Sequence, residues 1–126
     1  MKINRLLICL TPLCLLVSSC SSGSDSGNKT KTIGAYKIEQ GADLLRARLT
    51  GEDLSGVNLR GANLESAQLD DADLSGADLS GANLRNALLM DTDLSGANLT
   101  GAQLMGASMY GAILTGATMP DGTIHD

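Results

Sequence analysis

Residues 61–84 read GANLESAQLDDADLSGADLSGANL, with a leucine at every fifth position and an alanine two residues before each of those leucines. The spacing extends well beyond this stretch, because fourteen of the fifteen positions spaced by five from Leu44 to Leu114 are Leu and the other is Met109. We call the residue at each of these fifteen positions the central residue of a five-residue unit. Glycine stands two residues after the central residue in ten of these units. A five-residue repeat with these features organises most of the chain.

The period of five excludes a helix and indicates a coil with regular corners. A step of five residues turns an α-helix by about 140° beyond a full turn, so the leucines would spiral around every face. In an extended strand the alanine and the leucine lie on the same side, but the next apolar residue follows three positions later. The chain therefore has to turn after each leucine, and Gly, Ser, Asn or Asp two residues later suits a corner.

The composition restricts the core that such a coil can build. The chain has 126 residues, enough for one small domain, with 15 Gly, 2 Tyr and neither Trp nor Phe. An aromatic core is therefore excluded, and the interior has to consist of stacked Ala and Leu side chains.

The motif A-[DN]-L-x-x, as in Ala62-Asn63-Leu64 and Ala97-Asn98-Leu99, resembles the signature of the pentapeptide-repeat family over residues 42–121. The resemblance implies an all-β fold, a right-handed quadrilateral β-helix with twenty residues in each coil. Sixteen five-residue units then make about four coils. With layers about 4.8 Å apart, the stack would be about 19 Å tall.

Both ends of such a stack need covers, because they present unpaired backbone groups. We expect residues 33–41 to form an N-terminal cap, with Tyr36 and Ile38 over the first coil. We expect residues 122–126 to form a C-terminal cap or tail, in which Ile124 folds back as a lid.

Two features of the repeat depart from a uniform exterior and interior. Glu52 occupies an inward position that normally holds a small residue, so we expect a local distortion in the first coil. Asp53, Asp73 and Asp93 stack in register on one outer face, either as a cation-binding column or as a solvated acidic ladder. We favour the ladder, because repulsion over about 5 Å of water is only about 1 kcal/mol and calcium requires converging oxygens.

An apolar cluster is expected on the outside of the C-terminal half. The stretch 97–120 contains no charged residue, although the preceding repeats contain several. The outward positions in and beside this stretch hold Leu88, Met90, Met105, Tyr110 and Ile113. Exposed apolar clusters on small domains usually mark interfaces, although an idle surface would have the same composition. We expect a homodimer or another envelope protein as the partner at this end.

The N-terminus has the features of an export signal. Lys2 and Arg5 precede an apolar run over residues 6–17. A membrane-spanning helix needs about 20 apolar residues, so this shorter run is typical of a secretory signal. Val17-Ser18-Ser19-Cys20 resembles the bacterial lipobox. The resemblance implies a lipoprotein signal peptide over residues 1–19, cleavage after Ser19, and lipidation of Cys20 with diacylglycerol and an N-acyl chain such as palmitate.

The same resemblance predicts where the protein resides. Ser21 follows Cys20 where Asp would favour retention at the inner membrane, so we expect a lipid-anchored envelope protein, at the outer membrane facing the periplasm in a Gram-negative cell. Residues 20–32 contain no large apolar side chain. We therefore expect them to form a flexible tether between the lipid and the domain.

No catalytic constellation is expected. His125 is the only histidine, all three cysteines lie within residues 1–20, and the glycines do not form a phosphate-binding loop. We therefore expect a non-enzymatic structural or interaction module with no cofactor, no metal and no nucleic-acid partner. The alternative is a DNA-mimicking, topoisomerase-binding pentapeptide protein. It suits a charge of 7 − 14 = −7 after loss of Lys2 and Arg5, but an export signal disfavours it.

Overall fold

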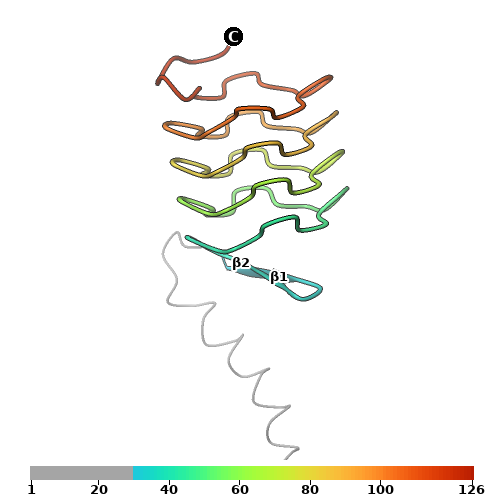
Figure 1. Ribbon diagram of the computed structural model, residues 1–126. Coiled ribbons are helices and arrows are strands. Elements are labelled where there is room, and N and C mark those ends of the chain that lie inside the picture. Colours follow the sequence, from blue (N-terminus) through green and yellow to red (C-terminus); the bar gives the residue numbers. More distant parts are fainter. Residues whose placement is uncertain (1–29) are drawn as a thin grey trace, which may run out of the picture.

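The computed structural model describes residues 30–126, which form a stack of four coils (Figure 1). Parallel bridges join residues twenty apart, beginning with Asp43 to Asn63 and ending with Asn98 to Thr118. Each coil therefore takes twenty residues and makes one bridge to its neighbour on each of four sides. The expected right-handed quadrilateral β-helix is confirmed.

Each side of the stack is a short ladder of residues twenty apart. Four outward residues define each ladder, one from each coil. The first side holds Asp43, Asn63, Asn83 and Gln103; the second Arg48, Gln68, Leu88 and Ser108; the third Asp53, Asp73, Asp93 and Ile113; the fourth Asn58, Asp78, Asn98 and Thr118.

The corners are β-turns that begin at each central leucine. In the first of them, Ala47 N donates to Leu44 O at 3.0 Å, and Arg46 has a φ of 57°. A positive φ at the third turn residue is typical of a type II turn, which explains why ten of these positions are glycine. Arg46, Ser66, Asp71, Asn86 and Asp91 adopt the same conformation without being glycine.

The interior is a column of apolar side chains. The central leucines from Leu44 to Leu99 are at most 1% exposed, and so are most of the alanines two residues before them. Thr92 replaces one of these alanines and is fully buried. Its hydroxyl donates to Leu69 O at 2.7 Å, so the buried polar group is satisfied.

An antiparallel hairpin covers the N-terminal end. It consists of β1 (Lys31–Ile33) and β2 (Tyr36–Ile38), and it lies against the first coil (Figure 1). Ile38 is fully buried, Tyr36 is half-buried, and the Tyr36 hydroxyl lies 3.4 Å from Arg48 N. The hairpin begins at Lys31, two residues before the expected start of the cap.

The expected distortion at Glu52 is wrong. Asp73 N donates to Glu52 O at 3.0 Å, and Glu52 N donates to Leu49 O at 3.2 Å, as at the other inward positions. Glu52 lies in the first coil and is only half-buried, so its carboxylate does not have to enter the closed interior.

The tail at the C-terminal end covers one side of the last coil only. Ile124 bridges Thr118 in the antiparallel direction, and His125 N donates to Ala117 O at 2.8 Å. Ile124 is itself 61% exposed, so the expected lid is incomplete. No helix within residues 30–126 is long and apolar enough to cross a membrane.

Candidate functional site

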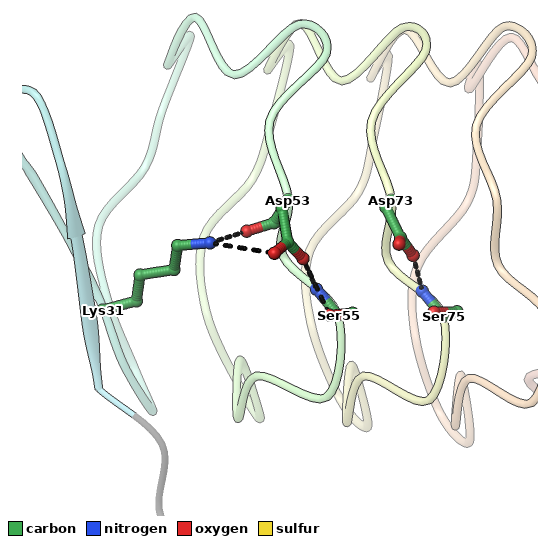
Figure 2. Close-up of polar contacts among 5 residues, drawn as sticks. All are labelled: Lys31, Asp53, Ser55, Asp73 and Ser75. Atoms are coloured by element: carbon green, nitrogen blue, oxygen red, sulfur yellow. Dashed lines mark hydrogen bonds and ion pairs between the residues drawn. The ribbon is translucent and has the colours of Figure 1, made fainter. Parts of the chain in front are cut away.

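The aspartates of the third side act as acceptors for their own corners. Asp53 Oδ1 accepts the backbone N–H of Ser55 at 3.0 Å, and Asp73 Oδ1 accepts that of Ser75 at 2.9 Å (Figure 2). Asp93 repeats the contact with the N–H of Ser95 at 2.9 Å. The three carboxylates therefore each serve a local turn.

The backbone explains why Asp or Asn precedes most central leucines. In the unit 62–66, four N–H groups donate to backbone carbonyls, two of them to the coil above and one to the coil below. The remaining N–H, that of Glu65, donates to Asn63 Oδ1 at 3.3 Å. The same bond recurs at Asn58, Asp78, Asn83, Asn98 and Asp121. A short side-chain acceptor completes the hydrogen bonding of these units, which supports the ladder interpretation of the column.

Lys31 binds the first aspartate of the third side, at the N-terminal end of the column. Lys31 Nζ donates to the backbone oxygen of Asp53 and lies 3.7 Å from its Oδ2 (Figure 2). In the coils above, the equivalent oxygens accept backbone N–H groups, as Asp73 O does from Leu54 N. Lys31 therefore replaces a donor that a further coil would supply. Within residues 30–126, no group of three or more His, Cys, Asp or Glu side chains is arranged to hold a metal ion.

Replacing Asp73 tests the structural role of the column. Asp73→Ala should lower the free energy of unfolding by about 1 kcal/mol, because the N–H of Ser75 loses its acceptor. Asp73→Asn should leave it almost unchanged, since an amide oxygen accepts the same bond. Urea unfolding of both variants would measure the difference. Equal losses in both variants would mean that the charge, and not the acceptor, is what matters.

Acid should destabilise the stack. Hydrogen bonds lower the pKa of three aspartates. The largest effect on the pKa of Asp53 and Asp93 comes from the hydroxyls of Ser55 and Ser95, and the second largest from the backbone N–H groups of the same serines. The hydroxyl and N–H of Thr123 lower the pKa of Asp121 in the same way.

Because these pKa values are lower in the folded state, their contribution is complete above the unfolded pKa and disappears as the pH falls through the folded one. The melting temperature should be level from pH 7 to about pH 5 and fall below about pH 4. Ser95→Ala should weaken this pH dependence. A melting temperature that stays constant to about pH 2 would contradict the prediction.

The second side lacks this hydrogen-bond pattern. Its outward residues before the central leucines are Arg48, Gln68, Leu88 and Ser108, none of which is Asp or Asn. Among the residues of this side that the structure describes, only Met90 has a comparable bond, because its N–H donates to Asp70 Oδ1 of the coil below at 2.9 Å. The side that carries Leu88, Met90 and Tyr110 is thus also the side on which no residue before a central leucine is Asp or Asn.

The predicted apolar residues are all exposed, in the last two coils. On the second side, Leu88 is 38%, Met90 41% and Tyr110 81% exposed, and Tyr110 lies one coil above Met90. Met105 is 67% exposed at the preceding corner, and Ile113 is 49% exposed on the third side. We call these five residues the apolar shoulder.

The open C-terminal end extends the apolar shoulder over the top of the stack. The inward residues Leu104, Met109, Leu114 and Met119 are only partly buried, in contrast to their counterparts below. Among the described residues, no acceptor pairs with the backbone N–H groups of Leu104, Gly106, Met109, Gly111 and Leu114. The carbonyls of Ala102, Ala107 and Ala112 also lack a donor there.

Sequence reasoning missed this open end. The inward residues of the last coil have the same apolar character as the buried ones below, so the repeat pattern does not distinguish them. His125 lies in the tail, and its backbone pairs with both Ala117 and Gly116.

Comparisons with known proteins agree with this architecture. The model for pentapeptide repeats matches residues 40–65, 53–91 and 82–119, with eight copies. The chain matches no curated protein.

Among solved structures, the chain is similar to alr5209, a pentapeptide repeat protein from Nostoc PCC 7120, with 44% identity over 58% of this chain and 60% of that one and a TM-score of 0.58. It is similar to AT2G44920, a pentapeptide repeat protein from the Arabidopsis thaliana thylakoid lumen, with 38% identity over 69% of this chain and 64% of that one and a TM-score of 0.57.

HetL, a pentapeptide repeat protein involved in heterocyst differentiation regulation in Nostoc sp. strain PCC 7120, shares 46% identity over 66% of this chain and 43% of that one, with a TM-score of 0.43. The chain spans less than two thirds of the length of each of these three proteins. With the repeat model matching most of its length, the chain belongs to the pentapeptide-repeat family.

Proposed function

We propose that this protein is a lipid-anchored interaction module of the bacterial envelope, without enzymatic activity, and that it binds a protein partner through its C-terminal end. Pentapeptide-repeat proteins are generally structural or interaction proteins. The observation that carries the proposal is the last coil, which combines unpaired backbone groups, partly exposed inward residues and the apolar shoulder.

Electrostatics favours this end over the four sides. The described chain is acidic below residue 97, whereas residues 97–120 contain no charge. A partner that covers residues 97–120 therefore buries no unpaired charge, which would cost several kcal/mol. The sides present Asp, Glu, Lys and Arg to solvent and lack this advantage.

The proposed anchor lies at the other end of the chain. The lipobox-like segment and Cys20 precede the described residues, and the hairpin of β1 and β2 is at the N-terminal end of the stack. A lipid on Cys20 would thus attach the protein to the membrane through the covered end. The open end would be the one farther from the point of attachment and accessible to a partner.

Cys20→Ala should release the protein from membranes. Two or more acyl chains, at about 0.8 kcal/mol for each buried methylene, give nearly permanent anchoring, and the variant has no thiol at the position to be lipidated. Fractionation of cells would measure the soluble share, with Cys14→Ala as the matched control. Retention of Cys20→Ala in the membrane fraction would refute the lipoprotein assignment.

The partner can be captured by a photo-crosslinking residue in place of Tyr110, which is 81% exposed. An adduct of twice the monomer mass in cells would identify a homodimer, and a band of another mass would identify an envelope protein. The same probe in place of Thr50, on the second side of the first coil, is the control. An absence of adducts at position 110 would refute the proposed interaction surface.

The alternative function is binding to a type II topoisomerase by mimicry of DNA. The acidic charge favours it, and the aspartates of the third side form a regular ladder. An exported protein would not meet a topoisomerase, so the fractionation experiment also decides between the two functions.

A further inference from the structure

The tail demonstrates how the open end accepts a strand. Over the fourth side of the last coil, Met119 N donates to Thr123 O at 2.7 Å and Gly116 N donates to His125 O at 2.7 Å. In the other direction, His125 N donates to Ala117 O at 2.8 Å. Residues 123–125 thus occupy the position that a fifth coil would take on this side. Among the described residues, the corresponding groups on the other three sides have no partner, except Gly101 N, which donates to Pro120 O at 2.9 Å.

The tail also decides which occupant fits those three sides. It rises one strand layer above the last coil, a step of about 4.8 Å. The flat end of a second copy would meet the tail first and leave a gap of one layer over the other sides. A single extended segment fills that layer and can pair with the N–H groups of Leu104, Met109 and Leu114.

We propose that the three open sides of the last coil bind an extended segment of a partner protein, which adds to the stack as a partial fifth coil. This inference rests on the proposed function, since it specifies what the C-terminal end recognises. Backbone hydrogen bonds supply the pairing, as in other cases of strand addition. The side chains that point inward supply the selectivity.

The last coil specifies the pattern of the segment. Leu104, Met109 and Leu114 recur every five residues and are partly exposed at the end. A segment that covers them needs a leucine-like residue every five positions and a small residue two positions before each. Its outward residues are unrestricted where they reach solvent. Near the apolar shoulder, however, an apolar residue would bury Tyr110 and Ile113.

The chain itself contains a suitable probe. A labelled peptide with the sequence of residues 71–84, DADLSGADLSGANL, has three such units, one for each open side. The control peptide has serine in place of its three leucines. Binding of both peptides to the full chain in detergent would be followed by fluorescence anisotropy, and amide hydrogen exchange would locate the contact.

Variants at residue 109 isolate the backbone pairing. Met109→Pro removes an N–H that points out of the stack. The bond from Ser108 N to Ala87 O at 2.9 Å is kept. The variant should therefore still fold, since proline is tolerated on edge strands. Met109→Leu keeps the N–H and restores the residue common in the repeat. Proline should weaken peptide binding at least about tenfold, and leucine should change it less than about twofold. Melting curves would establish that both variants fold.

Hydrogen exchange on the unaltered chain gives a result that depends on no variant. The amides of Leu104, Met109 and Leu114 should exchange freely and become protected when the peptide binds. Three results would overturn the inference: no saturable binding, equal binding by Met109→Pro, or a stable dimer whose end amides are already protected. If a partner still crosslinks to position 110 without peptide binding, only strand addition fails and the proposed interaction surface remains.

Discussion

Leu79→Asp should prevent the stack from folding. Leu79 is fully buried in the second coil, with coils on both sides of it. A carboxylate at this position would be surrounded by alanine and leucine side chains and would have no partner to offset its desolvation. The expected loss exceeds about 4 kcal/mol, a large share of the stability of a small domain. Circular dichroism and thermal unfolding would measure it.

Two variants separate burial from charge in this experiment. Leu79→Met keeps the volume and the apolar character, so it should cost less than about 1.5 kcal/mol. Thr50→Asp adds the same charge at an exposed outward position and should have little effect. A cooperative melt of Leu79→Asp near the temperature of the unaltered protein would show that the assignment of inward positions is wrong.

Gly76→Val should destabilise the stack through the conformation of one corner. Gly76 has a φ of 66°, and nothing lies within 4 Å of the position of an added Cβ. The cost therefore comes from the backbone conformation alone. A left-handed conformation costs an L-residue about 1–2 kcal/mol, and a β-branched side chain is the least suited to it. We expect a loss of about 2 kcal/mol in urea unfolding.

The reverse exchange is the matched control for this corner effect. Asp71 has a φ of 62° without being glycine and lies exposed at another corner. Asp71→Gly should raise the stability by up to about 1 kcal/mol, because the strain of the left-handed conformation is relieved. A destabilised Asp71→Gly together with an unaffected Gly76→Val would contradict the conformational argument.

The polar exterior and the C-terminal end have different physical roles. On the third side, Asp73 and Asp93 complete the hydrogen bonding of the turns that follow them, so the regular acidity needs no ligand to explain it. At the end, Leu104 and Met109 have neither a coil above them nor an acceptor for their N–H groups. Binding is therefore expected where the repeat stops and not along its sides.

Several elements could be predicted because they depend on local and repeated rules. The spacing of Leu64, Leu69 and Leu74 excludes a helix, and the glycines two residues after many leucines predict left-handed corners such as Gly76. The exposure of Met105 and Tyr110 follows from their outward positions in the same register. The distortion expected at Glu52 is absent, because the Glu52 side chain is only half-buried in the first coil.

The sequence by itself determined the repeat, the inward and outward positions, the corners and the apolar character of residues 97–120. These follow from the alternation of side chains and from the turn preferences of single residues, which act within a few positions. Only the tertiary structure decided that Lys31 supplies a donor to Asp53, that the tail covers one side, and that three sides stay open. Those facts depend on which segments meet across the stack, and a periodic sequence looks the same in its last coil as in its middle.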